Sequence, residues 1–282
     1  MQRNAFLTLS PAKRLGLLAF TLLVVLLTSY LLAVARQNHL NQSLIASILR
    51  NDPVKVTSLL HQGADPNTVY VAHRHTSLWQ QVLSSLFARN RKDVKSPSAL
   101  QVCCDINVEG HALETIHPDI VRALLEQGAN PNVSDEEGCT PLMNSFFFLH
   151  EEIPLLLIEH GADVNARSKD GVTPLDFAIN FRIRHWDDDA VLISLLQHGA
   201  RVNDADTQSF TALHWSIIIS DVAGARILLA HGADPTMKVK AHGKAKALGD
   251  AVAVAKLFKN PVMIALMESS MSQRKKGAKP TP

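Results

Sequence analysis

The longest hydrophobic stretch of the chain lies close to its start. Residues 15–35 (LGLLAFTLLVVLLTSYLLAVA) contain no charged residue. A helix rises about 1.5 Å per residue, so this stretch is long enough to cross roughly 30 Å of hydrocarbon. Arg3, Lys13 and Arg14 precede it, and no acidic residue does. We therefore predict one membrane-spanning helix, with residues 1–14 in the cytoplasm and the rest of the chain on the opposite side.

The end of this stretch leaves two alternatives open. Ala33, Val34 and Ala35 have the small-x-small form of a signal-peptide cleavage site. The apolar run, however, exceeds the roughly 7–15 residues of a signal-peptide core. We favour an uncleaved single-pass anchor in the inner (plasma) membrane, followed by a linker at residues 36–41. The alternative is a soluble periplasmic protein cleaved after Ala35.

Downstream, short apolar clusters alternate with polar turns at a regular spacing. The cluster Leu155–Ile158, for example, is followed by the turn Gly161-Ala162-Asp163. Turns of this Gly-Ala-x form start at successive steps of 65, 33, 38 and 33 residues. A period near 33 indicates a solenoid, in which each unit buries its apolar face against the next one. The turns start at Gly63, Gly128, Gly161, Gly199 and Gly232.

A Thr-x-Leu signal follows four of these turns, twelve or thirteen residues after the glycine. Thr can cap the start of a helix, Pro fits the first turn, and Gly can take the left-handed conformation that ends a helix. Each unit is therefore predicted to hold a turn and two antiparallel helices. The signals are Thr76-Ser77-Leu78, Thr140-Pro141-Leu142, Thr173-Pro174-Leu175 and Thr211-Ala212-Leu213.

These motifs together resemble the ankyrin repeat, most specifically in the last three units. The resemblance implies an all-α fold, with an ankyrin-repeat solenoid at residues 42–270 behind the single membrane helix. Three departures from the repeat are expected: an insertion at about residues 88–118 between the helices of the second unit, five extra residues near 185–189, and a final unit, 237–270, without the Thr-Pro-Leu signal. Residues 271–282 are predicted to be a disordered basic tail.

Composition and motifs exclude several functional classes. The 282 residues are 46% hydrophobic and 19% charged, and a formal net charge of +2 argues against a nucleic-acid binder. The chain has no Gly-rich phosphate loop, no Gly-x-Ser-x-Gly motif and no His-Glu-x-x-His motif. We therefore predict that the protein is not an enzyme and uses no cofactor, metal or small-molecule substrate.

The thirteen histidines do not predict a metal site. His160, His198 and His231 precede the glycine of successive units, which would place them roughly 10 Å apart, whereas His ligands lie near 2 Å from one ion. At the end of a helix these side chains instead complement the helix dipole. His73 and His75 lack an evident third ligand.

Two further clusters leave alternatives open. Asp187–Asp189, after Trp186, form either an acidic recognition loop or the negative start of an outer helix, and the second interpretation is favoured. The cysteines are odd in number. In an oxidising compartment Cys139 can cross-link the solenoid to Cys103 or Cys104 of the insertion, and thiols without a role are the favoured alternative.

The family resemblance implies that the turns, called fingers, and one face of each inner helix line a concave surface that binds other proteins. Here the seventh and eighth positions after the Thr are mostly apolar. Phe177 and Trp215, at the fourth position, extend this strip or belong to the core. We predict a protein-binding groove, unless a shifted helix or the insertion covers it. Its residues are Phe147, Phe148, Phe181, Ile218, Ile219 and Phe210, flanked by Glu136, Lys169 and Asp170 of the fingers.

These observations predict a non-catalytic protein-interaction module on the periplasmic side of the membrane. Its partners are expected to be another protein and, through the first helix, the membrane itself. Bacterial ankyrin proteins of this layout resemble immunity proteins that neutralise secreted toxic effectors. The alternative is a structural, assembly or stress-protection factor for a periplasmic enzyme such as a catalase.

Overall fold

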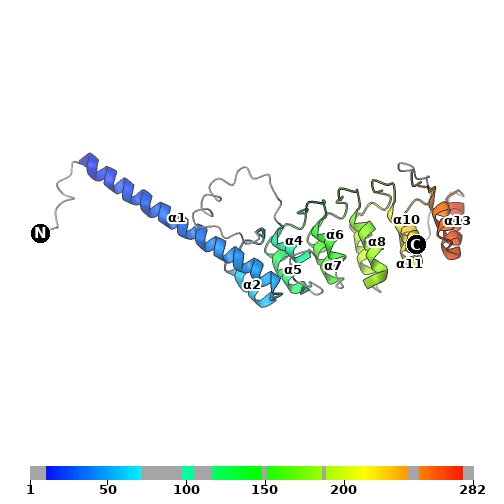
Figure 1. The fold of residues 1–282 in the computed structure, drawn as a ribbon, viewed down its shortest axis with the longest axis horizontal. Coiled ribbons are helices and arrows are strands. Elements are labelled where there is room, and N and C mark those ends of the chain that lie inside the picture. The colour runs from blue at the N-terminus through cyan, green and yellow to red at the C-terminus, as the bar shows by residue number, and fades with distance from the viewer. Residues whose placement is uncertain are drawn as a thin grey trace.

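A computed structural model of the chain describes residues 11–70, 97–104, 116–147, 151–185, 189–240 and 248–275. Helix pairs stack into an elongated rod, and one long helix, α1 (Pro11–Leu49), projects from its amino-terminal end (Figure 1). Over the described ranges, β-structure is limited to isolated bridges. The predicted all-α solenoid is confirmed.

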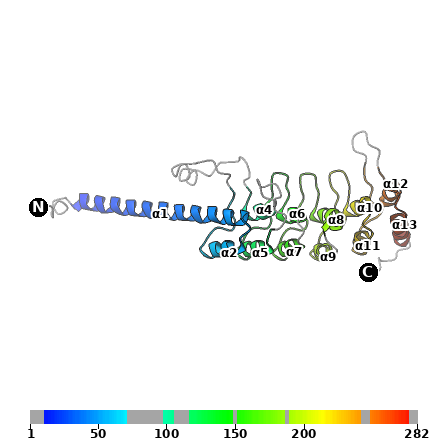
Figure 2. The same ribbon diagram turned by 60° about the horizontal axis from the view of Figure 1, so that its bottom comes forward.

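Each unit pairs an inner helix with an outer helix. The inner helices form one row, the outer helices form a second row, and the fingers project beyond the inner row (Figure 2). Neighbouring helices pack against one another throughout the inner row and along most of the outer row. The pairs are α1 with α2 (Pro53–His61), α4 (Ala99–Cys104) with α5 (Pro118–Glu126), α6 (Pro141–Ser145) with α7 (Glu152–Glu159), α8 (Pro174–His185) with α9 (Ala190–Gln197), α10 (Ala212–Ile218) with α11 (Val222–Ala230), and α12 (Ala251–Leu257) with α13 (Pro261–Lys275).

Local capping explains where these helices begin and end. The Thr140 hydroxyl accepts a hydrogen bond from the Met143 N–H at the start of α6. Asp221 and Asp250 carboxylates accept the equivalent bonds at the starts of α11 and α12. At the other end, an outer helix such as α7 stops before a glycine in the left-handed region, Gly161 with φ of 82°.

A ladder of asparagine side chains ties successive units together. The Asn165 Nδ2 donates to the Gly199 carbonyl (3.0 Å), and its Oδ1 accepts from the Arg201 N–H (2.8 Å). One side chain therefore satisfies two backbone groups in the turn that follows the next outer helix. The same pair of bonds joins three other unit boundaries, through Asn67, Asn132 and Asn203.

The carboxyl-terminal part of α1 is the inner helix of the first unit. Its Leu44 and Ile48 are buried, and α1 packs against both α2 and α4. Two side chains replace the ladder asparagine here. The Gln37 Nε2 donates to the Gly63 carbonyl (2.9 Å), and the Asn41 Oδ1 accepts from the Asp65 N–H (2.9 Å). The turn after α2 is thus bonded to α1 in the same way as each later turn is bonded to the unit before it.

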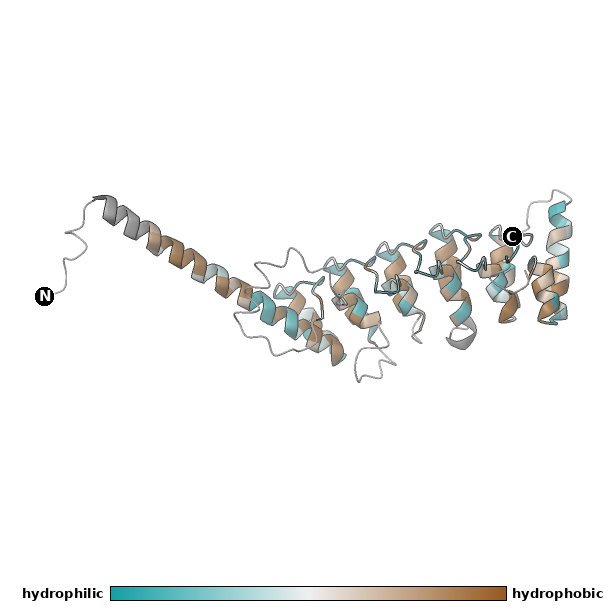
Figure 3. Cartoon of the chain, turned by 45° about the horizontal axis from the view of Figure 1, so that its top comes forward, coloured by the Kyte–Doolittle hydropathy of each residue, from teal (hydrophilic) through white to brown (hydrophobic). Residues whose placement is uncertain are grey.

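The predicted linker at residues 36–41 is therefore wrong, because these residues lie inside α1. The segment contains neither Gly nor Pro, so nothing interrupts its helical hydrogen bonds. Before it, α1 is apolar and exposed; Phe20 and Leu23 are each 62% exposed. Figure 3 shows this part as a largely brown helix outside the stack. In the part of the chain that the structure describes, Ala19–Leu49 is the one segment long and apolar enough to cross a membrane.

The second unit differs from its predicted layout. Val69 and Ser98 form an antiparallel bridge. Ser98 then begins α4, where its hydroxyl accepts from the Gln101 N–H and the Gln101 side chain accepts from the Ser98 N–H. An inner helix therefore lies inside the range 88–118 that was predicted as an insertion. The Thr76–Leu78 signal and most of the extra residues, 71–96 and 105–115, lie outside the described residues.

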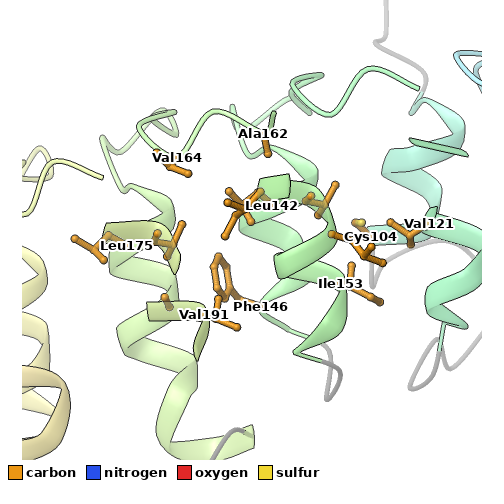
Figure 4. Close-up of a cluster of buried hydrophobic side chains, with 14 of the residues drawn as sticks. Cys104, Val121, Leu142, Phe146, Ile153, Ala162, Val164, Leu175 and Val191 are labelled. Atoms are coloured by element: carbon orange, nitrogen blue, oxygen red, sulfur yellow. The ribbon is translucent and has the colours of Figure 1, made fainter. Parts of the chain in front are cut away.

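One apolar core runs between the two rows. Figure 4 shows part of it, with Phe146 among side chains contributed by α4 to α9. Phe146 is fully buried, and so are Cys103 and Cys104 on α4. None of the three cysteines forms a disulfide. The two in α4 are thus core residues, and a cross-link between either of them and Cys139 is not formed.

The final unit extends further than predicted. Helix α13 continues to Lys275, so the predicted disordered tail from Met271 begins as helix. Near its end, Arg274 forms an ion pair with the Asp234 carboxylate in the preceding unit. Residues 276–282 lie outside the described part of the chain.

Candidate protein-binding surface

The inner row carries a cluster of three phenylalanine rings. Phe147 follows α6, while Phe177 and Phe181 lie one turn apart on α8. The Phe147 ring meets Phe181 edge-on at a centroid distance of 4.5 Å and lies 6.1 Å from Phe177. Its side chain is 36% exposed, whereas the preceding Phe146 is buried completely. Because edge-on ring pairs attract each other, the cluster forms a stable apolar surface across two units.

The next inner helix continues this surface. The Phe210 ring lies against Trp215 at a centroid distance of 5.2 Å. Ile218 and Ile219 follow at the end of α10, partly buried and packed against the core. The Trp215 Nε1 is shielded from solvent and has no hydrogen-bond partner among the described residues. Packing alone therefore holds the indole in place.

The fingers are joined to one another in register. The Lys169 N–H donates to the Glu137 carbonyl (2.8 Å), and the Thr207 N–H donates to the Asp170 carbonyl (2.8 Å). The Lys169 Nζ also lies 3.4 Å from a Glu137 carboxylate oxygen. Glu136 is exposed beside this pair. These fingers therefore form a continuous rim.

The rim borders the apolar surface directly. The Asn144 side chain, at the fourth position of its unit, donates to the Asp135 carboxylate in a finger (3.4 Å). At the equivalent position of a later unit, Trp215 packs against Phe210, which ends a finger. The apolar surface beside the rim is called the aromatic strip below, and it consists of Phe147, Phe177, Phe181, Phe210, Trp215, Ile218 and Ile219.

A family model described as ankyrin repeats (3 copies) matches residues 78–168 and 110–187 of this chain. The chain contains ankyrin repeats. Ankyrin repeats indicate a module that binds other proteins, and in this member α1 to α2 and α10 to α13 continue the same helix pairing beyond the matched residues.

The structure allows most predicted site residues of this ankyrin protein to be placed. Phe147, Phe181, Phe210, Ile218 and Ile219 lie along the inner row, and Glu136, Lys169 and Asp170 lie on the rim. Phe148 lies outside the described residues. Sequence reasoning missed the last unit, where Leu257 and Phe258 are 58% and 45% exposed at the seventh and eighth positions after Asp250. An Asp in place of the usual Thr cap hid this register.

The stacked histidines of the ankyrin units lie where the outer helices end. His160, His198 and His231 are the C-cap residues of α7, α9 and α11. In each, Nδ1 lies 2.8–2.9 Å from the carbonyl oxygen four residues earlier. These rings complete the last helical turn, as the sequence predicts. Within the described ranges, His, Cys, Asp and Glu side chains form no group that could hold a metal ion.

The acidic clusters also lie at helix starts. Asp189 is the N-cap residue of α9, while Trp186 and the two preceding aspartates lie outside the described residues. Glu152 begins α7, where its carboxylate bonds to Arg122 of the previous outer helix (2.6 Å). The positions of Asp189 and Glu152 therefore favour the interpretation that these acidic residues stabilise the helix dipole.

An unusual ionisable residue occupies one inner helix of this ankyrin stack. Asp176 is fully buried, and one carboxylate oxygen accepts from the Thr173 N–H and hydroxyl at 2.8 and 2.7 Å. The other oxygen, Oδ1, has no partner among the described residues. The pKa of the Asp176 carboxyl is raised to about 6, chiefly by burial and also by nearby Asp206, while the bonds from Thr173 and the charge of Arg167 oppose this rise.

In the next unit the equivalent residue bonds to the unit that follows it. There the third helical residue is His214, whose Nδ1 accepts from Thr211 and whose Nε2 lies 3.2 Å from the Met237 carbonyl of the following unit. Burial lowers the pKa of His214, so the ring is neutral and donates that bond. An ionised Asp176 has no proton to donate in this way, which leaves its second oxygen buried without a donor.

Replacing Asp176 with Asn is expected to change the pH dependence of stability. The folded-state pKa of about 6 lies above the ordinary value of 3.8, so protonation stabilises the fold as pH falls through 6 toward 4, by on the order of 3 kcal/mol. Asp176→Asn should raise stability at pH 7 and flatten the curve between pH 4 and 6. Thermal melts across this range would measure both effects.

Two observations distinguish the contribution of Asp176 to the pH dependence from that of other groups. Burial also raises the pKa of Asp206, so a smaller slope of the same sign should remain in the variant. An Asp176→Asn protein that is less stable at pH 7 and keeps the full slope would contradict the role of Asp176.

Proposed function

We propose that this ankyrin protein is a membrane-anchored recognition module that binds another protein through the aromatic strip and catalyses no reaction. The observation that carries the proposal is the contrast between adjacent residues. Phe146 fills the core, but Phe147 is 36% exposed and packs mainly with rings at the surface of the stack. Exposed aromatic clusters on a rigid frame are typical energetic centres of protein interfaces.

The anchor supports a location for this recognition. The exposed apolar part of α1 matches the thickness of a bilayer, and the solenoid follows it without a break. Cationic residues before the span and the absence of acidic ones there favour a cytoplasmic amino terminus. We therefore place the solenoid on the periplasmic side of the inner membrane.

Two roles considered from the sequence require this same surface. One is immunity against a secreted toxic effector, and the other is assembly or protection of a periplasmic enzyme. The identity of the captured partner distinguishes them.

The binding proposal is tested with Phe147→Ser and Phe181→Ser combined in the membrane-anchored chain. Because these rings are only partly buried, we expect less than about 2 kcal/mol loss of stability. Partner capture from membranes should fall at least tenfold, as expected when two aromatic anchors are lost. Affinity capture with quantitative mass spectrometry measures the loss, and a thermal melt confirms that the variant is folded.

A matched control is available in the first unit. Val54 is 80% exposed and lies on α2, away from the aromatic strip. Val54→Ser should leave capture unchanged. If the Phe147→Ser/Phe181→Ser protein is folded and captures the same proteins as the original chain, the aromatic strip is not the binding surface.

The topology is tested with reporters fused after Pro282. We expect alkaline phosphatase, which matures only outside the cytoplasm, to be active there, and a fluorescent protein that matures only in the cytoplasm to be dark. Reversing the charges before the span, with Arg3, Lys13 and Arg14 changed to Glu, should reduce phosphatase activity. A bright fluorescent fusion of the original chain would refute the periplasmic placement.

A further inference from the structure

We propose that the aromatic strip receives a partner segment that combines apolar anchors with Lys or Arg residues, the cationic side chains lying against the rim of the fingers. This inference rests on the proposed function and specifies the partner's chemistry. It comes from the charge of the fingers beside the strip.

The rim is strongly acidic next to the phenylalanine cluster. The three fingers at residues 133–139, 166–172 and 204–210 contain six acidic and two basic residues. Both basic residues already have acidic partners within the rim. Lys169 pairs with Glu137, and the Arg167 Nη1 lies 3.0 Å from an Asp204 carboxylate oxygen.

The remaining acidic groups divide into two kinds. Asp135 and Asp206 accept backbone N–H bonds within their own fingers, so they shape the turns. Glu136 and Asp170 are exposed, and in the described part of the chain neither forms an ion pair. These two carboxylates are therefore available to a cationic partner.

Neighbouring groups respond to this negative field. Burial, and after it the charges of Asp135, Glu137 and Asp170, raise the pKa of the Cys139 thiol to about 11. Asp170 likewise adds to the rise in the pKa of Asp206 that burial causes. The contributions of these carboxylates to the two shifts indicate that they disfavour an additional negative charge along this rim and favour a positive one.

The aromatic strip beside the rim also favours a cationic partner. Aromatic faces attract Lys and Arg side chains, and Arg in particular stacks on them while its guanidinium reaches a carboxylate. The cluster of Phe147, Phe177 and Phe181, in which Phe147 is 36% exposed, provides aromatic rings, and the rim provides the carboxylates. A segment with only apolar residues would leave the acidic rim uncompensated.

The charge of the rim changes from negative to positive in the last unit, which predicts the orientation of the partner segment along the solenoid. Lys238 and Lys240 are exposed on the finger that precedes α12. The cationic part of the partner segment therefore lies over α6 and α8, and any acidic part lies toward α12.

The test selects random linear peptides, displayed on phage, against the full chain in detergent micelles, with counter-selection on the Phe147→Ser/Phe181→Ser protein. We expect the selected peptides to combine Phe, Trp or Leu with Lys or Arg. A synthetic peptide of the selected sequence should bind about tenfold more weakly to a Glu136→Lys/Asp170→Lys protein, and more weakly at high salt. Fluorescence anisotropy measures both changes.

A matched charge reversal controls for net charge. Glu126 and Glu159 are exposed at the ends of the outer helices α5 and α7, away from the rim, and Glu126→Lys/Glu159→Lys should leave peptide affinity unchanged. Selected peptides that depend on Phe147 and Phe181 but are acidic or uncharged, or that ignore Glu136→Lys/Asp170→Lys, overturn this inference and leave the proposed function standing. A selection without any peptide that depends on the two phenylalanines counts against both.

Discussion

Replacing Phe146 with Ala is expected to lower the free energy of unfolding by about 3–5 kcal/mol, because the change deletes a large, fully buried side chain and leaves a cavity. The ring lies in the continuous core that joins α4 to α9 (Figure 4). Each unit contacts only its neighbours, so the loss should concentrate in the units built on α6 and α8. Urea denaturation gives the total, and hydrogen exchange shows which helices lose protection.

The adjacent residue provides the control for this prediction. Phe147→Ala removes the same number of atoms from a side chain that is 36% exposed, and should lower stability by a much smaller amount. Equal losses for the two variants would mean that Phe147 is a core residue, and the aromatic strip would then lose its main support.

Removing residues 1–49 is expected to unfold the first unit, whereas removing residues 1–35 is not. The longer deletion takes away Leu44, Ile45 and Ile48 and exposes the α2 face that they cover. Each lost buried Leu or Ile contributes about 1.5–3 kcal/mol. The shorter deletion removes mainly exposed apolar residues and leaves Gln37 and Asn41 bonded to the first turn.

Hydrogen exchange in α2 measures this difference directly. We expect protected amides in α2 for the chain that starts at Arg36 and rapid exchange there for the chain that starts at Arg50. If both chains protect α2 equally, the end of α1 is not the inner helix of the first unit.

The repeat could be predicted from sequence because its signals are local. Gly161 and its equivalents are required wherever the chain must take a positive φ, and Thr140, Thr173 and Thr211 begin their helices at the predicted positions. The period of these residues is visible without any knowledge of tertiary contacts. The three units that hold the aromatic strip therefore follow the predicted register.

The first two units could not be predicted in the same way. Ser98-Ala99-Leu100 has the same form as Thr76-Ser77-Leu78, and it is the reciprocal bonds between Ser98 and Gln101 that show a helix start at Ser98. In α1, the polar residues at 36–41 mark the end of the apolar stretch, but they do not signal that the helix continues. What makes its end the inner helix of the first unit is the contact with α2 and α4, which the sequence does not display.

The continuous helix α1 has a mechanical consequence. No hinge residue separates the exposed apolar part of α1 from Leu44 and Ile48 in the core, and Gln37 and Asn41 bond the intervening turns to the first unit. The solenoid therefore cannot swivel on the proposed anchor as a domain on a flexible tether does. A force that a partner exerts on the aromatic strip is therefore transmitted through the solenoid to α1. The proposed bilayer span must then tilt together with the solenoid.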